Sequence, residues 1–171
     1  QLYPDFAYHN QNKKKLLQQI FLSARTELIL KSFVQGKCYF ESNQCMAFFA
    51  FQIKNIFPKA KFIHIVRHPG DFVVSALKKG WYRNDTIWEY GRIKKKSAKW
   101  TSCCQEEKLA WLWNETNSFI EKFKRAIPPQ DVFFMSFTEL VSNVPRLVDL
   151  LQFVDIKDVN REQLTTAISS K

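Results

Sequence analysis

Apolar residues recur along the chain in two patterns, one typical of helices and one of buried strands. Residues 13–35 carry leucine and isoleucine at helical spacing, and Gly36 follows where a helix commonly ends. Residues 45–56 predict a second helix, which ends before Pro58 because the residue preceding proline avoids the helical conformation. Residues 105–126 predict a long amphipathic helix. The chain is therefore rich in helices.

Short apolar runs separate these helices. The runs "KFIHIVR" at 61–67 and "VFFMSF" at 132–137 are continuously apolar, which is typical of strands buried on both faces of a parallel sheet. The aromatic run "CYFES" at 38–42 predicts a further short strand. Strands that alternate with helices indicate an α/β fold with a mainly parallel sheet.

The remaining segments are marked by proline and glycine. We expect a helix to begin at Pro69 and to end at Gly80, and residues 81–101 to form a long irregular loop or lid. The last helix is expected to begin near Thr138 and to break or restart at Pro145.

No composition shift or linker divides the sequence. We therefore expect a single domain over residues 1–171, with residues 1–12 and 157–171 peripheral or flexible.

The charge of the chain favours anionic ligands. The formal net charge is +10, which suits nucleotide phosphates, acidic glycans, nucleic acid or acidic lipid. No apolar run approaches the roughly 20 residues of a membrane span, and the first residues do not resemble a secretory signal. The four cysteines lack CxxC spacing, so we expect no zinc site. We interpret them as reduced thiols of a cytoplasmic protein; the alternative is a Golgi-lumen enzyme in which two of them pair.

One stretch has the pattern of an anion site. Arg67 is the last residue of a predicted strand, and the turn at residues 68–70 begins a helix whose free N–H groups favour an anion. Ser75 lies almost two helical turns further on, and its side chain leans back toward the turn. Arginine and serine together suit a phosphate monoester. The alternative is that Arg67 only pairs with Asp71.

The sequence around this stretch resembles a known family. The segment "FPKAKFIHIVRHPGDFVVSALKKGWY" resembles the 3'-phosphate-binding segment of sulfotransferases that use 3'-phosphoadenosine 5'-phosphosulfate (PAPS). Arg67 and Ser75 match the pair that holds the 3'-phosphate in that family. Phe137, in "VFFMSFTELVSNVPRLVDLLQFVDI", stands where the family usually has a tyrosine that contacts adenine. The resemblance runs over about residues 16–156.

The resemblance implies a fold and a reaction. The implied fold is a three-layer, P-loop NTPase-like sulfotransferase domain, with a mainly parallel sheet flanked by helices. The implied reaction transfers a sulfuryl group from PAPS to a hydroxyl or amine of a small molecule, glycan or protein, releases adenosine 3',5'-bisphosphate (PAP), and needs neither metal nor nucleic acid. Glu41, in "YFESNQ", is a candidate general base; its alternative is a structural carboxylate at a strand end.

The sequence departs from the family pattern at the other end of the donor. The family holds the 5'-phosphosulfate with a "PKSGTT"-type loop, but none of the glycines forms such a loop and Ser42 replaces the lysine expected beside Glu41. We therefore expect an N-terminally incomplete domain that is a poor catalyst alone; the alternative is a degenerate domain that keeps only 3'-phosphate recognition. The alternative function is a non-catalytic basic module that binds nucleic acid or sulfated glycan. The glycines are Gly36, Gly70, Gly80 and Gly91.

Overall fold

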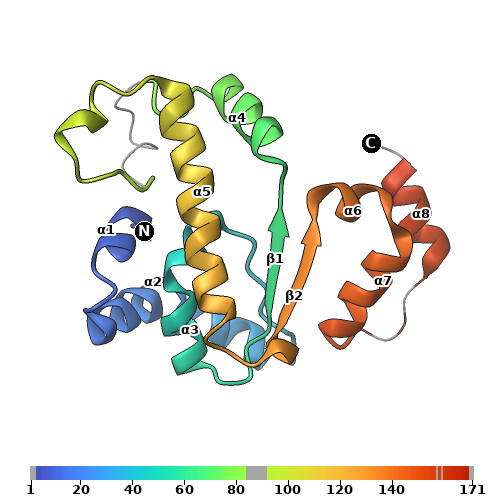
Figure 1. Cartoon of the computed structure of the whole chain (residues 1–171). Coiled ribbons are helices and arrows are strands. Elements are labelled where there is room, and N and C mark those ends of the chain that lie inside the picture. The colour runs from blue at the N-terminus through green and yellow to red at the C-terminus, as the bar shows by residue number, and fades with distance from the viewer. Residues whose placement is uncertain (1–2, 84–91, 157, 159, 170–171) are drawn as a thin grey trace.

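The protein is described here by a computed structural model of residues 3–83, 92–156, 158 and 160–169 (Figure 1). Its sheet has two parallel strands, β1 (Phe62–Val66) and β2 (Val132–Ser136). The strands pair from Phe62 opposite Val132 to Val66 opposite Ser136, so their carboxyl ends lie together. The residues that follow the two strands therefore lie close together, at the carboxyl ends of the strands.

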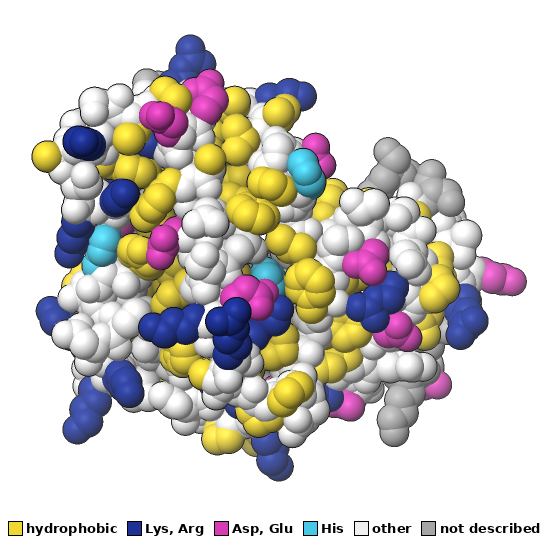
Figure 2. Space-filling view, viewed as in Figure 1, with side chains coloured by type: hydrophobic (Ala, Val, Ile, Leu, Met, Phe, Trp, Pro, Cys, Tyr) yellow, Lys and Arg dark blue, Asp and Glu magenta, His cyan; other side chains and the backbone are white. Residues whose placement is uncertain are grey.

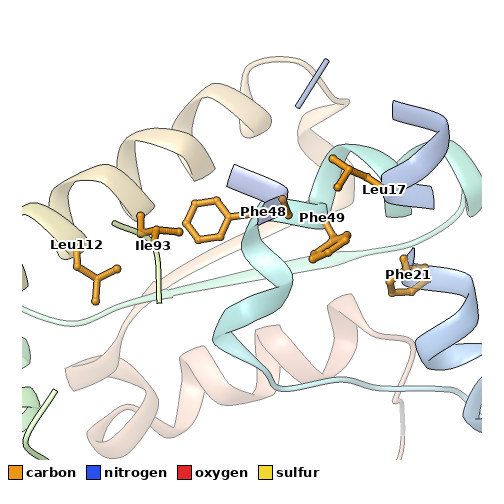
Figure 3. Close-up of a cluster of buried hydrophobic side chains, with 7 residues drawn as sticks. Leu17, Phe21, Phe48, Phe49, Ile93 and Leu112 are labelled. Carbon is orange, nitrogen blue, oxygen red and sulfur yellow. The ribbon is translucent and has the colours of Figure 1, made fainter. Parts of the chain in front are cut away.

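The N-terminal helices form the main hydrophobic core with α5. They are α1 (Pro4–His9), α2 (Lys14–Val34) and α3 (Ala50–Ile56), the last preceded by the 3₁₀ segment η1 (Gln44–Phe49). Figure 3 shows phenylalanine and leucine side chains of these elements converging on one interior. Burial of such side chains is the main favourable contribution to folding. The fully or almost fully buried members of this cluster are Ala7, Leu17, Phe21, Phe48, Phe49, Ile93 and Leu112.

The long helix α5 (Gln105–Lys124) runs between this core and the sheet (Figure 1). It packs against the shorter helix α4 (Pro69–Lys78), which follows β1. Along the sheet, Phe123 of α5 meets Phe62, with ring centroids 4.7 Å apart, and Asn117 of α5 bonds to the buried His64 over 3.1 Å. The helix therefore connects the core to β1. The short 3₁₀ segments η3 (Ala98–Trp100) and η4 (Pro129–Asp131) lie before and after it.

Three helices follow β2, on the side of the sheet away from the main core (Figure 1). They are α6 (Phe137–Ser142), α7 (Val144–Phe153) and α8 (Arg161–Ser169). The break between α6 and α7 falls at Asn143, whose side chain accepts a hydrogen bond from the Arg146 N–H and so caps α7. The break predicted near Pro145 is thus confirmed. Within the described residues, no helix is long and apolar enough to cross a membrane.

The other predicted elements are confirmed with two corrections. The helices expected over 13–35 and 105–126, and the one expected to begin at Pro69, are present within one or two residues, and Gly36 takes the left-handed conformation with φ of 63°. The strand predicted at 38–42 is wrong, because this run has no regular structure and no strand pairs with it within the described residues. The helix predicted at 45–56 is 3₁₀ in its first half.

The α/β fold class is confirmed as a mixture of helices with a small parallel sheet, and the three-layer architecture remains a prediction. The prediction that both strands are buried on both faces is wrong. Ile65 in β1 is 42% exposed and Phe134 in β2 is 45% exposed. The physical reason is that each face of the sheet is covered over one strand only: on one face His64 is buried and its register partner Phe134 is exposed, and on the other Met135 is buried and its partner Ile65 is exposed.

The two ends of the chain, residues 1–12 and 157–171, were both predicted to be peripheral or flexible, and each contains a helix. For residues 1–12, α1 lies within the segment and buries Pro4 and Ala7, the latter in the core. The expectation for residues 157–171 remains a prediction; α8 forms within this segment, and the helix itself was not expected from the sequence. The predicted loop at 81–101 lies partly outside the described residues.

Candidate functional site

Two of the residues singled out from the sequence meet at the carboxyl ends of the strands. Val66 and Ser136 are register partners, and Arg67 and Phe137 are the next residue of each chain segment. The Arg67 guanidinium carbon lies 5.0 Å from the centroid of the Phe137 ring, within the range of a cation–π contact. Both side chains keep substantial exposure to solvent. The strand register therefore brings the Arg67 cation and the Phe137 ring together at the carboxyl ends of the strands.

The position of Phe137 is set by a capping box at the start of α6. The Ser136 hydroxyl accepts a hydrogen bond from the Glu139 N–H over 3.1 Å, and the Glu139 carboxylate accepts one from the Ser136 N–H over 2.7 Å. These two bonds satisfy backbone donors that a helix otherwise leaves free, so α6 begins at Phe137. The hydrogen bond from the Ser136 N–H also lowers the pKa of Glu139.

The backbone of Arg67 is anchored by α5. The indole N–H of Trp113 donates a hydrogen bond to the Arg67 carbonyl over 2.9 Å. The sequence alone does not identify this contact. Chemistry gives one reason to expect it: an indole N–H close to the protein interior needs a hydrogen-bond acceptor, and the end of a strand offers a free carbonyl. We therefore add Trp113 to the site as a positioning residue.

The helix that follows Arg67 leaves its first N–H groups without a side-chain cap. His68 stands at the N-cap of α4 but accepts no capping hydrogen bond, which leaves the N–H groups of Gly70 and Asp71 without that partner. The ten-residue helix also points its positive dipole end toward the carboxyl ends of the strands. The site therefore has backbone donors as well as the guanidinium.

Ser75 lies in the middle of α4 and is half-buried. Its hydroxyl makes no hydrogen bond with any residue that the structure describes, and no direct bond joins it to Arg67. Nor does Arg67 form an ion pair with Asp71 or with another carboxylate in the described part of the chain. The structure thus brings Arg67 and Phe137 together, and it leaves Ser75 on the adjacent helix with its hydroxyl available.

Glu41 lies in a different environment. Both of its carboxylate oxygens accept hydrogen bonds from the Arg25 guanidinium, each over 2.7 Å, and one also accepts a bond from the Tyr39 hydroxyl. These bonds, the Arg25 pair foremost, lower the pKa of Glu41, while burial raises the pKa of Tyr39 to about 12. Glu41 is therefore an ionised, fully engaged carboxylate, and no contact links it to Arg67.

The described residues contain no group of three His, Cys, Asp or Glu side chains that could hold a metal ion. All four cysteines are free thiols. The buried His64 bonds to Asn117, as expected for a core histidine, and burial lowers its pKa. The chemistry available at the strand ends is therefore the binding of an anion beside an aromatic surface.

Comparison with known proteins agrees with this chemistry. The family model described as "Sulfotransferase family" matches residues 3–158, which is most of the chain. No curated protein and no solved structure matches the sequence in the corresponding searches. The match covers β1, β2, α4 and α5 and every residue of the site described above. The chain belongs to the sulfotransferase family.

Proposed function

We propose that the protein binds the nucleotide part of PAPS at the carboxyl ends of β1 and β2 and serves sulfuryl transfer to a hydroxyl or amine. Membership of the sulfotransferase family supports the reaction class. The observation that carries the proposal is Arg67, whose guanidinium has no carboxylate partner among the described residues and lies against the partly exposed Phe137 ring.

The groups at these strand ends suit a phosphate monoester joined to an aromatic base. The Arg67 fork and the uncapped N–H groups of α4 supply donors for the 3'-phosphate, and the Ser75 hydroxyl supplies another. The ring of Phe137 is 39% exposed and offers an apolar face for adenine. In this proposal Trp113 acts through the backbone of Arg67, which it holds in place.

In sulfuryl transfer the bond between sulfur and the phosphate oxygen of the donor breaks, a bond from sulfur to the acceptor atom forms, and the acceptor loses a proton to a base. Glu41 was the candidate base. We propose instead that it is structural, because Arg25 and Tyr39 occupy its oxygens and its lowered pKa makes it a weak proton acceptor. We also propose a cytoplasmic location on the strength of the free thiols.

Donor-product binding tests this proposal directly. Binding of adenosine 3',5'-bisphosphate would be measured by isothermal titration calorimetry, with adenosine 5'-monophosphate as the matched ligand. Charge-assisted hydrogen bonds contribute about 1.5–3 kcal/mol, so Arg67→Ala should weaken binding at least about tenfold. Ser75→Ala removes one neutral donor and should weaken it by about three- to tenfold. Arg161→Ala, on the exposed face of α8, serves as the control for lost charge.

Two results would refute the assignment. Equal affinities for the two nucleotides would show that the 3'-phosphate is not recognised. Binding to polyanions that falls steeply with salt and ignores both Arg67→Ala and Ser75→Ala would favour the basic binding module instead.

A further inference from the structure

A second candidate binding site lies away from the strand ends. A hollow of about 400 Å³ opens beside α1, within the range of roughly 300–1,000 Å³ typical of small-ligand sites. It combines the rings of a tyrosine and a phenylalanine with four polar or charged side chains, and α1 with its two capping residues supplies all of them except Lys96. The residues that line it are Tyr3, Asp5, Phe6, His9, Asn10 and Lys96.

The wall of the hollow is fixed by bonds between α1 and the segment at residue 94. The Lys94 N–H donates to the Asp5 carboxylate over 2.7 Å, and His9 Nε2 lies 2.7 Å from the Lys94 carbonyl oxygen. A carbonyl only accepts, so Nε2 of His9 must carry the proton. Ala7, on the opposite side of α1, is fully buried in the core. The hollow is therefore held by fixed elements.

Three of its side chains keep an acceptor atom that no described hydrogen bond uses. Asp5 bonds through Oδ1 and retains Oδ2. Asn10 donates its amide N–H to the Phe6 carbonyl over 2.8 Å and retains Oδ1. His9 bonds through Nε2 and retains Nδ1, which is an acceptor when the ring carries the Nε2 proton alone. Lys96 adds an exposed cationic donor. The hollow thus offers both acceptors and donors, which suits a ligand rich in hydroxyl groups, because each hydroxyl can donate and accept.

The charges argue against ionic ligands. The Asp5 carboxylate would repel a phosphate or sulfate group. A cationic ligand would be repelled by Lys96 and by Lys13, whose ammonium lies 5.9 Å from the Phe6 ring centroid. Figure 2 shows that basic side chains are frequent on the side of the molecule that carries α1. A neutral hydroxylated ligand avoids both penalties.

The aromatic rings favour a sugar ring over an open-chain polyol. Tyr3 is 50% exposed and Phe6 is 36% exposed, so both retain apolar surface that a flat C–H face can cover. We propose that this hollow binds a neutral sugar unit, with its hydroxyls bonded by Asp5, His9 and Asn10. This inference rests on the proposed function: because the hollow lies away from the strand ends, the sugar that it binds is a unit of the acceptor glycan other than the one that receives the sulfuryl group.

Saturation-transfer NMR and calorimetric titration with short neutral oligosaccharides of glucose, galactose, mannose and N-acetylglucosamine test the proposal. At least one of these probes should bind. Tyr3→Ala removes one aromatic wall and should weaken that binding by about tenfold, the effect of losing a buried aromatic contact of about 1.4 kcal/mol. Asp5→Asn keeps the side-chain shape and should weaken it by about threefold or more. The control is Phe33→Ala, which removes a 78% exposed ring at the end of α2.

The outcomes separate this proposal from the donor site. Failure of all the oligosaccharides to bind, or equal binding by Tyr3→Ala, Asp5→Asn and Phe33→Ala, overturns the sugar site. Preference for a heparin fragment over every neutral probe overturns it as well. Adenosine 3',5'-bisphosphate should bind Tyr3→Ala and the unsubstituted protein equally, and its failure to bind the latter would instead overturn the proposed function.

Discussion

The Arg25–Glu41 pair allows the sharpest test of how this chain is built. We consider Glu41→Gln, which keeps the size of the side chain and removes its charge. In the folded protein the two side chains share two hydrogen bonds of 2.7 Å, and their exposed fractions are only 16% and 15%. The Tyr39 hydroxyl adds a third bond to the same carboxylate. The substitution therefore leaves the Arg25 guanidinium partly buried without its counter-charge.

The expected cost lies between two limits. Exposed ion pairs contribute about 0–1 kcal/mol, whereas removing one partner of a buried pair costs about 3–5 kcal/mol. The intermediate burial of this pair, with two short bonds, places the loss near 2 kcal/mol of unfolding free energy. For a chain of 171 residues this corresponds to a fall in Tm of about 4–8 °C.

Urea unfolding followed by tryptophan fluorescence and circular dichroism would measure the change. Arg25→Leu combined with Glu41→Leu should recover much of the lost stability, because the paired charges are removed together. An unfolding free energy within about 0.5 kcal/mol of the unsubstituted protein would refute the structural reasoning. If such a stable Glu41→Gln variant also lost sulfuryl transfer in an active form of the enzyme, Glu41 would be the general base after all.

The same pair predicts a pH dependence with a definite sign. Arg25 lowers the pKa of Glu41 below its ordinary value of 4.5, so the folded state favours the ionised carboxylate. The stabilisation is fully present above pH 4.5 and is lost as the pH falls through the lower pKa of the folded state. Stability curves of the protein and of Glu41→Gln should therefore converge in acid. Parallel curves down to the lowest pH would contradict this account.

Three further outcomes are expected. Trp113→Phe removes the bond to the Arg67 carbonyl, about 1 kcal/mol, and should weaken adenosine 3',5'-bisphosphate binding about fivefold in calorimetry while circular dichroism stays unchanged. Phe49→Ala empties a fully buried position and should cost about 3–5 kcal/mol in urea unfolding. Burial lowers the pKa of His64 below 6.5, so stability should fall as the pH drops below that value, and this dependence should shrink in His64→Leu.

Much of the helical architecture could be predicted because it rests on local signals. The spacing of apolar residues predicted the long helices. Proline and glycine, which mark where helices begin and end, predicted the start of α4. The predictions that were wrong concern segments whose structure depends on residues far away in the sequence. The run at 38–42 has strand-like residues, but Glu41 pairs with Arg25 of α2, and the Tyr39 hydroxyl donates to Glu41, instead of the run pairing in a sheet. Strand formation needs a neighbouring strand, which a local pattern cannot supply.

The geometry of the candidate site was predictable in part for the same reason. Arg67 and Ser75 belong to one continuous strand–turn–helix stretch, so their pattern is visible in the sequence. The contact of Arg67 with Phe137 needs the register of β1 against β2, and the bond from Trp113 needs the position of α5. These contacts join residues 46 and 70 positions apart (113 − 67 and 137 − 67), so spacing along the chain gives no access to them.

The cap at the start of α6 links the stability of a short helix to the choice of ligand. If Ser136 or Glu139 were exchanged for alanine, neither change would remove a group that touches the nucleotide in our proposal. Yet α6 could then start one residue later, and the ring of Phe137 would swing away from the guanidinium of Arg67. If the proposed site is correct, sequence variation at these two positions would therefore alter base preference among natural variants of this chain while the proposed phosphate-binding residues stayed the same.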